Sequence, residues 1–254
     1  MSDFDIPRDD AEKIFKEMII PQIVGDISQQ ETKQAYILGG QPGSGKSAFA
    51  REILRSNNNI VFINGDDLRA YHPRYYFYLK DNDKEAAEMT QSVCNFWIES
   101  LLNECMEKGL DFIVEGTMRK KEVPMKTALT SRNAGYDVNL VVISTPYDLS
   151  LSSIDHRYSE LKRLGQPARF TKKESHDEAF NNIEETLSDL IDSDLFKRFL
   201  IYKRLPGGFE EAIFETNQKG KVLQSFKEGR LRLVEDQEKE RPFVQEGSFK
   251  TSVR

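Results

Sequence analysis

The stretch "YILGGQPGSGKSAFAREIL" (residues 36–54) decides the fold of this chain. It begins with apolar residues typical of a buried strand, passes through a loop with four glycines, and continues in a helix-like pattern. Residues 40–47 match the eight-residue P-loop pattern, in which backbone N–H groups and the start of a helix surround phosphate oxygens. Because the match lies between a strand and a helix, we predict a binding site for a nucleoside triphosphate.

The lysine and the last serine of this loop have separate expected roles. Lys46 should reach the β- and γ-phosphates of ATP, and the Ser47 hydroxyl should hold Mg²⁺. The predicted ATP-binding residues are Gly40, Gln41, Pro42, Gly43, Ser44, Gly45, Lys46 and Ser47. The sequence lacks the Asn-Lys-x-Asp motif of guanine-reading switches, and it is short for a motor. A small-molecule kinase is therefore the favoured class of P-loop protein.

Strands and helices alternate along the rest of the chain. Apolar runs predict strands at 35–39, 60–64, 111–116, 137–144 and 199–204. Helical spacing predicts helices at 8–24, 47–54, 85–108, 122–133, 147–164 and 176–197. Because nearly all-apolar strands are covered on both faces, we expect an α/β fold: a P-loop NTPase three-layer sandwich with a mostly parallel central sheet and a helical lid. Residues 1–205 are the expected kinase domain, and residues 206–254, where the pattern weakens, are an expected C-terminal appendage or partly mobile tail.

The overall composition limits where the protein acts and what it binds. A net charge of −6 argues against a protein that binds nucleic acid or another polyanion. The two cysteines, Cys94 and Cys105, indicate buried thiols in a reducing compartment. The acidic N-terminal stretch has no apolar core of a signal peptide, and no apolar run approaches membrane-spanning length. We therefore expect a cytoplasmic protein with no membrane partner.

Two adjacent carboxylates follow the second predicted strand, in "NGDDLRAYHP". In α/β folds ligands bind at the carboxyl ends of the strands, so this position faces the expected site. Only one of two successive side chains of an extended chain can point into a site. Asp66 could take the proton from an attacking hydroxyl, with Asp67 as a helix cap. The alternative is that both make an ordinary turn or cap.

The third predicted strand ends in "VEGTMR". Glu115 could hold Mg²⁺ through water or grip acceptor hydroxyls, and Gly116 lets the backbone approach a ligand. The alternative is a solvated Glu115 followed by a helix-capping Thr117.

Arginines are concentrated in residues 156–179, which contain Arg157, Arg163 and Arg169. Phosphoryl transfer spreads negative charge over three equatorial oxygens, which guanidinium groups stabilise. A mobile helix–loop–helix over the P-loop would bring such groups to the phosphate. The alternative is a solvated basic helix face.

Several of these stretches, in one order, resemble the bacterial zeta toxins. They are "GGQPGSGKS", "INGDDLRAYHP", "IVEGTMRKKEVP", the "RY" at 157–158, the "AR" at 168–169 and the "HD" at 176–177. The resemblance covers about residues 35 to 200. It implies a P-loop kinase that phosphorylates UDP-N-acetylglucosamine on the sugar 3′-hydroxyl, which blocks the synthesis of cell-wall precursors.

The resemblance also assigns roles to single residues. The general base is implied at Asp66, seven residues before the proline of the His-Pro pair, and the P-loop lysine and hydroxyl are Lys46 and Ser47. Arg157 and Arg169 are implied to contact the transferred phosphate. The residues implied to hold the sugar nucleotide are Glu99, Glu115, Thr117, Arg119 and Thr127.

A small antitoxin protein covering the ATP site is the partner that the resemblance implies. Two alternatives stay open at this stage. One is a P-loop kinase for another hydroxyl acceptor, such as NAD or an antibiotic. The other is an ATP-gated binding module that transfers phosphate only to water.

Overall fold

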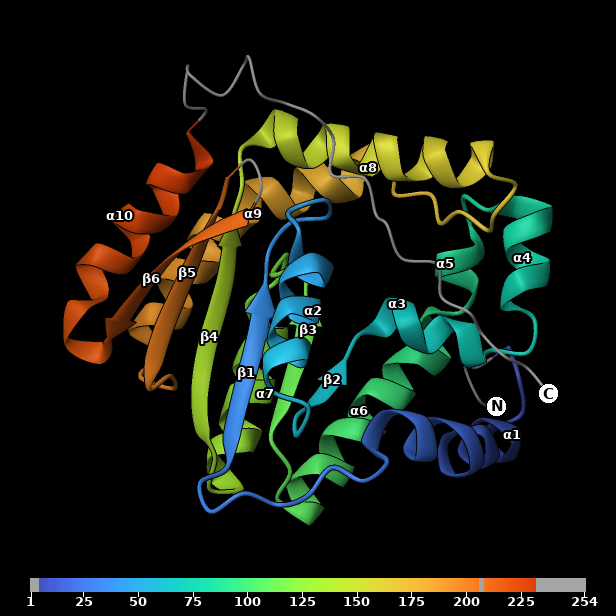
Figure 1. Ribbon diagram of the computed structural model, residues 1–254, viewed down its shortest axis with the longest axis horizontal. Coiled ribbons are helices and arrows are strands. Elements are labelled where there is room, and N and C mark those ends of the chain that lie inside the picture. The colour runs from blue at the N-terminus through green and yellow to red at the C-terminus, as the bar shows by residue number, and fades with distance from the viewer. Residues whose placement is uncertain (1–4, 206–207, 232–254) are drawn as a thin grey trace.

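Six strands form one mixed sheet in the part of the chain that the computed structural model describes, residues 5–205 and 208–231 (Figure 1). Their order is β2-β3-β1-β4-β5-β6, with β1 to β5 parallel and β6 antiparallel to β5. The strands are β1 (Gln34–Gly39), β2 (Val61–Ile63), β3 (Phe112–Gly116), β4 (Asp137–Ser144), β5 (Arg198–Leu205) and β6 (Gly208–Glu215). All five predicted strands are confirmed, and β6 was not predicted.

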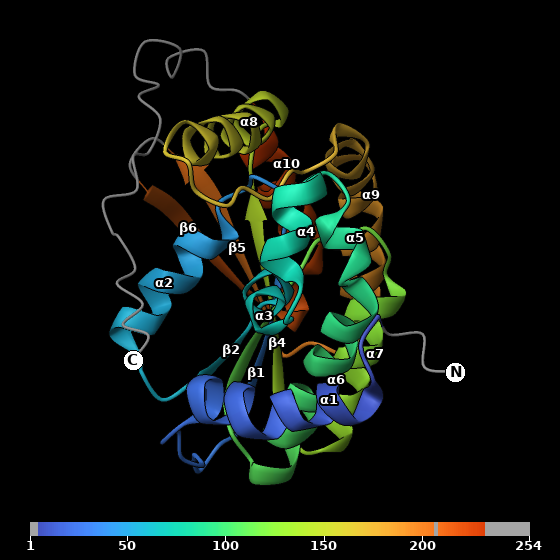
Figure 2. The same cartoon turned by 90° about the vertical axis from the view of Figure 1, so that its right-hand side faces the viewer.

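Helices cover both faces of this sheet, and α2 lies on the opposite side from α6, α7 and α9 (Figure 2). The longer helices are α1 (Arg8–Ile14), α2 (Lys46–Ser56), α4 (Tyr75–Asn82), α6 (Gln91–Lys108), α7 (Glu122–Asn133), α8 (Tyr147–Arg163), α9 (Lys173–Asp192) and α10 (Lys219–Arg230). The short or irregular ones are η1 (Phe15–Val24), α3 (Gly65–Leu68), η2 (Arg69–Tyr71), α5 (Ala86–Met89) and η3 (Thr216–Gln218). No helix of the described residues combines the length and apolarity needed to cross a bilayer.

Alternate residues of the central strands enter two separate apolar cores. In β4, Leu140 and Val142 join the core under α6, α7 and α9, whereas Val141 and Ile143 join the core under α2. This alternation explains why the central strands are apolar on both faces. The architecture is the expected three-layer P-loop α/β fold.

The sheet register places the candidate site residues side by side. Gly39, the last residue of β1, is paired with Gly116 of β3, and Leu38 is paired with Glu115. Ile63 of β2 is paired with Val114. The P-loop, Glu115 and the segment after β2 therefore leave the sheet at the same edge, and α8 crosses above it (Figure 1).

Two predicted helices are irregular for local reasons. The helix expected at 8–24 is α1 followed by the π-helix η1, which contains Pro21; a proline lacks the N–H that a regular helix needs. The helix expected at 85–108 is interrupted at Thr90, which separates α5 from α6. The Thr90 hydroxyl donates to the carbonyl of Ala86 and accepts a hydrogen bond from Arg69, so the break carries a structural contact.

The described part of the expected C-terminal appendage continues the main sheet. Strand β6 pairs with β5 over its whole length, from Arg198 opposite Glu215 to Leu205 opposite Gly208. Val222 and Phe226 of α10 are fully buried in the larger core. The boundary predicted after residue 205 thus falls between two paired strands, and residues 232–254 of the predicted tail lie outside the described residues.

Candidate functional site

The P-loop joins β1 to α2 and depends on glycine at fixed positions. Gly43 has φ +77°, and a Cβ atom there would lie 2.0 Å from the carbonyl oxygen of Ser150. Gly45, at φ +101°, precedes the first residue of α2. Glycine adopts such backbone angles without strain, and at position 43 it also leaves room for the Ser150 carbonyl. The loop can therefore turn its backbone N–H groups toward an anion.

Lys46 occupies the centre of this loop. Its side chain is buried, and Nζ donates to the carbonyls of Gly40 (2.7 Å) and Gln41 (3.1 Å) and lies 3.8 Å from a Glu115 carboxylate oxygen. Burial lowers the pKa of Lys46, and the carboxylates of Glu115 and Asp66 partly offset this effect. The loop therefore holds a cation at the position where terminal phosphates would bind.

Two loop serines fit the phosphate and metal roles predicted for them. The Ser44 hydroxyl is fully buried and has no hydrogen-bond partner among the described residues, an arrangement that a phosphate oxygen would satisfy. Ser47 is exposed, and its hydroxyl makes no hydrogen bond to a described residue. The Gln41 side chain, in contrast, is buried and donates to the Thr145 carbonyl (2.9 Å), and its backbone carbonyl accepts from Lys46, so its backbone N–H is the group left to meet a ligand.

Asp66 lies beside the P-loop at the start of α3. The Asn64 side chain accepts a hydrogen bond from the Asp66 backbone N–H (2.9 Å) and caps this short helix, so the predicted cap at Asp67 is wrong. The Asp66 carboxylate contacts Arg169, and it lies 3.4 Å from Nε of Arg69. Burial raises the pKa of Asp66, but the charges of Arg169, Arg69 and Arg157 outweigh it and hold that pKa below its usual value.

The neighbouring carboxylate, Asp67, has a different environment. Asp67 is exposed to solvent. Burial of its carboxyl group and the charge of Asp66 raise the pKa of Asp67 to about 6, and the charge of Arg51 partly offsets this rise. The lid arginines influence Asp66 and are not among the groups that shift Asp67. Asp66 is therefore the carboxylate that faces the lid.

Sequence reasoning missed Arg69, which anchors this corner. The Arg69 side chain is buried, and its guanidinium donates to the Thr90 hydroxyl (2.7 Å) and to the Gln91 side chain (2.7 Å). Arg69 contacts the Asp66 carboxylate from its own helix, and Arg169 contacts the same carboxylate from the lid. The signal that could have found it is the spacing of three residues between Asp66 and Arg69, which places both on one helix face.

Glu115 connects the P-loop to the end of β2. Its carboxylate accepts a hydrogen bond from the Asn64 amide (3.2 Å) and pairs with Lys46. Burial raises the pKa of Glu115, and the charge of Lys46 partly offsets this effect. Glu115 is therefore held inside the site, which disfavours the alternative that it is a solvated side chain.

Four of the five residues predicted to hold the acceptor line one cavity of about 390 Å³. They are Glu115, Thr117, Arg119 and Thr127. The fifth, Glu99, does not line this cavity; it lies exposed on α6 and pairs with Lys126 of α7 (2.8 Å). Lys120 and Glu178 also line the cavity and were not predicted.

The lid consists of α8, residues 164–172 and the start of α9. The Arg157 side chain is exposed and interacts electrostatically with Asp66, Glu115 and Arg169, without a hydrogen bond or ion pair to another described residue. Nε of Arg169 is buried and has no partner among the described residues. Both guanidinium groups can therefore donate hydrogen bonds to an anion. Arg163, in contrast, pairs with Glu160 on the exposed face of α8.

One carboxylate fastens the lid to the opposite side of the site. Asp83, just after α4, accepts a hydrogen bond from the Tyr158 hydroxyl (2.8 Å) and pairs with Lys162, and both of these residues belong to α8. Lys172 and Glu88 form a further ion pair at 2.6 Å. These contacts keep α8 and the following loop over the site.

Arg204 of β5 is a second residue that sequence reasoning missed. Its guanidinium donates to the Gly43 carbonyl (2.6 Å), and the Phe209 ring lies next to Gly45. When P-loop N–H groups point inward to an anion, the carbonyls point outward and need donors. The β5–β6 hairpin therefore supports the outer side of the loop.

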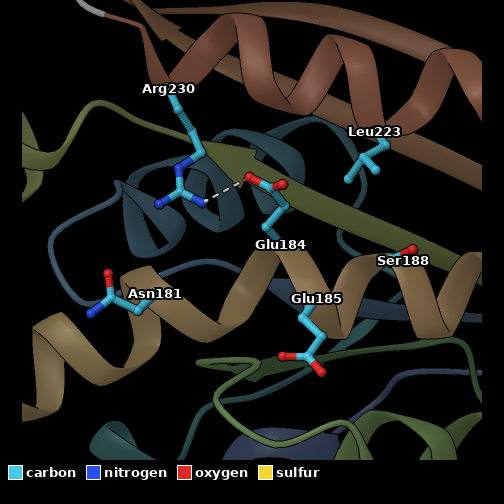
Figure 3. Close-up of a pocket in the computed structure, with 6 residues that line it drawn as sticks. All are labelled: Asn181, Glu184, Glu185, Ser188, Leu223 and Arg230. Atoms are coloured by element: carbon cyan, nitrogen blue, oxygen red, sulfur yellow. Dashed lines mark ion pairs between the residues drawn. The ribbon is translucent and has the colours of Figure 1, made fainter.

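A second cavity, of about 480 Å³, lies between α9 and α10 (Figure 3). It is lined by Asn181, Glu184, Glu185, Ser188, Leu223 and Arg230. Arg230 reaches from α10 to Glu184 (3.8 Å), and its guanidinium packs on the Phe180 ring. This cavity contains none of the predicted site residues.

Comparison with known proteins identifies the family of this chain. The Zeta toxin family model matches residues 22–222. The chain is 34% identical over 203 residues to Toxin PezT of Streptococcus pneumoniae, a match that covers 79% of this chain and 80% of that protein. It is 30% identical to Toxin zeta of Enterococcus hirae over 73% of this chain, and that match spans 65% of the relative's length.

Solved structures give the same result. A structure from the PezAT chromosomal toxin–antitoxin system of Streptococcus pneumoniae superposes with a TM-score of 0.72 at 25% identity, over 89% of this chain and 96% of that chain. The AvrRxo1-ORF1:-ORF2 complex, with a TM-score of 0.58 at 12% identity, shares the fold. The family model covers most of the chain, and a relative 34% identical is matched over 79% of it, so this chain belongs to the zeta toxin family.

Proposed function

We propose that this chain transfers the γ-phosphoryl group of ATP to the 3′-hydroxyl of the sugar of UDP-N-acetylglucosamine. The observation that carries the proposal is the position of Asp66, whose carboxylate feels the charges of Arg169 and Arg157 and itself acts on Lys46. A carboxylate beside a phosphate cradle can accept the proton of an attacking hydroxyl. Arg169, Arg157 and Lys46, which surround this carboxylate, carry positive charges that would stabilise the charge of the transferred group.

The proposed division of labour follows from what each side chain contacts. Asp66 accepts the hydroxyl proton as the oxygen attacks phosphorus. Lys46 compensates the charge on the terminal phosphates, and Arg157 and Arg169 neutralise the equatorial oxygens of the moving phosphoryl group. Because Arg169 is paired with Asp66 in this arrangement, it must shift from the carboxylate toward the phosphate when ATP is bound.

Mg²⁺ fits this site through Ser47 and the nucleotide rather than through a cage of protein ligands. Among the described residues no group of three or more His, Cys, Asp or Glu side chains could hold a metal ion. Mg²⁺ commonly keeps several waters and binds to substrate phosphates with few protein ligands. When bound, it would supply neutralisation of the β- and γ-phosphates, and the free Ser47 hydroxyl is its proposed protein ligand.

The acceptor is proposed to bind in the 390 Å³ cavity that begins at Glu115. Its polar lining suits a sugar nucleotide: Thr117 and Thr127 offer hydroxyls, and Arg119 and Lys120 offer positive charge for a diphosphate. Glu115 joins this cavity to Lys46, so an acceptor held there has a path to the phosphate. Glu99 would take part only if Lys126 released it.

A small antitoxin that covers the ATP site is the proposed protein partner. The support is the family membership and the pneumococcal PezAT toxin–antitoxin system, whose structure superposes on this chain. Phosphorylation of UDP-N-acetylglucosamine in the cytoplasm would block the synthesis of cell-wall precursors.

A kinase for NAD or an antibiotic is the alternative enzyme, and an ATP-gated binding module is the alternative from another class.

A product assay tests the proposal. The chain is incubated with ATP, Mg²⁺ and, in separate reactions, UDP-N-acetylglucosamine, other UDP-sugars and NAD, and the products are identified by phosphorus NMR and mass spectrometry. We expect a 3′-phosphorylated UDP-N-acetylglucosamine. Phosphorylated NAD as the sole product would support the alternative kinase, and ADP with inorganic phosphate alone would support the binding module.

A further inference from the structure

Three buried polar side chains connect the lid to the P-loop, and the roles proposed so far do not use them. Gln41 belongs to the P-loop, Ser150 to α8 and His176 to α9, and their exposed fractions are 1%, 0% and 0%. Nε2 of Gln41 lies 3.3 Å from the Ser150 hydroxyl, and Nε2 of His176 lies 2.8 Å from the same hydroxyl. Buried polar groups destabilise a core unless they are paired, so this chain of contacts indicates a specific arrangement.

One set of proton positions makes the contacts directional. Nδ1 of His176 lies 3.2 Å from the Asp177 carboxylate, so an N–H there donates to Asp177 and leaves Nε2 as an acceptor. In this set the Ser150 hydroxyl donates to Nε2 of His176 rather than to the Tyr147 carbonyl (2.9 Å), and it accepts from the Gln41 amide. Asp177 is itself held by the Tyr147 hydroxyl (2.8 Å) and by Lys173 (2.5 Å). The order Gln41, Ser150, His176, Asp177 therefore runs from the P-loop to the start of α9.

Serine, histidine and aspartate in this order also occur in hydrolases, but burial excludes that chemistry here. The Ser150 hydroxyl is closed off from solvent and lies within 3.1 Å of the Pro146 and Tyr147 carbonyls of its own helix. On the other side, the Ser150 backbone carbonyl packs against Gly43. No acyl substrate can reach the oxygen, so the contacts must act on structure.

The structural effect falls on Arg157. Ser150, Ile154 and Arg157 are spaced by four and three residues and lie on one face of α8. Ser150 and Ile154 of this face both pack on Gly43 of the P-loop. Arg157, the next residue of the face, interacts with Asp66 and Glu115. The rotation of α8 about its axis therefore decides whether Arg157 faces the phosphate cradle.

We propose that Ser150 and His176 are positioning residues that lock α8 on the P-loop, so that Arg157 is delivered to the transferred phosphoryl group. The inference rests on the proposed function, because it assigns Arg157 to phosphoryl transfer. Ser150 touches neither nucleotide phosphate nor acceptor in this role. Its effect passes through the orientation of one helix.

Double-mutant kinetics test the inference. We expect Ser150→Ala to lower kcat by roughly 10- to 100-fold with little change in KM for either substrate, since small misplacements of a catalytic group have effects of this size. In an Arg157→Ala background the same change should have almost no further effect. The matched control is Ser152→Ala, an exposed serine of α8 that donates to the Leu149 carbonyl. Equal losses from Ser150→Ala in both backgrounds, or a result like that of Ser152→Ala, would overturn the inference.

A binding measurement separates this inference from the proposed reaction. The affinity for Mg²⁺, ADP and tetrafluoroaluminate, relative to Mg²⁺ and ADP alone, reports contacts to a transferred phosphoryl group without any acceptor. Wild type and Ser152→Ala should gain affinity from the fluoride, and Ser150→Ala and His176→Ala should lose most of that gain. His176→Gln, which retains an acceptor atom, should recover part of it. No gain in wild type would contradict both proposals, whereas a full gain in Ser150→Ala would contradict the positioning role alone.

Discussion

The guanidinium group of Arg169 contacts the carboxylate of Asp66, although the two residues lie 103 positions apart in the chain. Together with Arg69 it lowers the pKa of Asp66 against the effect of burial. The proposed base is therefore ionised across the neutral range, and its charge is partly compensated by the lid. The contact also links lid position to base strength, because a lid that lifts removes the largest of the lowering charges.

This link predicts a shift in the pH profile of Arg169→Ala. A base must be ionised, so kcat/KM falls as pH drops through its pKa in the free enzyme. In wild type the pKa of Asp66 is lowered, so the acidic limb that Asp66 sets should lie at low pH. Without Arg169 the pKa of Asp66 rises, so the acidic limb should move to higher pH. Arg163→Ala, which removes an exposed lid arginine, should leave the limb in place, and a limb that does not move in Arg169→Ala would contradict the pairing.

Substitution of the two adjacent aspartates should separate catalysis from local charge. Asp66→Asn should keep ATP affinity within a few-fold and lower turnover by about 10²–10⁴, the usual contribution of a positioned base. Asp67→Asn removes the exposed neighbour whose pKa is about 6 and should keep most of the turnover. The measurements are steady-state kinetics and ATP titration calorimetry. The reverse pattern would assign the base to Asp67.

Glycine-to-alanine changes should show which loop needs space rather than a backbone angle. Gly43 and Gly165 both have positive φ, +77° and +65°, but a Cβ meets the Ser150 carbonyl at Gly43 and nothing within 4 Å at Gly165. Gly165→Ala should lower the free energy of unfolding by about 1 kcal/mol and keep the ATP affinity. Gly43→Ala should weaken ATP binding by at least about tenfold, measured by calorimetry, because the P-loop or α8 must move.

Two threonines of α7 offer a matched test of the acceptor cavity. Thr127 lines the cavity, whereas Thr130 does not, and each hydroxyl donates to the carbonyl four residues earlier. Thr127→Val should raise KM for UDP-N-acetylglucosamine by about 5- to 20-fold, the effect of losing one hydrogen bond to substrate, with the KM for ATP unchanged. Thr130→Val should behave like wild type. Equal KM values in the two variants would place the acceptor elsewhere.

The sequence was sufficient for the five parallel strands and for the candidate residues at their carboxyl ends. Buried strands such as β4 are apolar on both faces, and a P-loop needs glycines at fixed spacing, so both leave strong local signals. Asp66 and Glu115 were found because residues at or just beyond the carboxyl end of a parallel strand face the ligand edge. The structure brings these residues and the predicted lid arginines Arg157 and Arg169 together around Lys46.

The remaining features depend on contacts between distant segments. Strand β6 is an edge strand in which three of the five exposed positions are glutamates, so its apolar pattern is weak. Arg204 and Ser150 are ordinary residues of a strand and a helix until the fold places both against Gly43. Glu99 came from family resemblance alone, and its pairing with Lys126 was not visible in the spacing of either helix.

The Lys46 ammonium donates two hydrogen bonds, to the carbonyls of Gly40 and Gln41, so the P-loop is preorganised before a nucleotide binds. The Lys46 amine occupies the loop and bonds to its backbone carbonyls. An incoming triphosphate would exchange those two bonds for bonds from the Lys46 ammonium to phosphate oxygens, in a P-loop that is already ordered. Association of ATP with the P-loop should therefore be fast, and closure of the lid over the bound nucleotide should be the slower step.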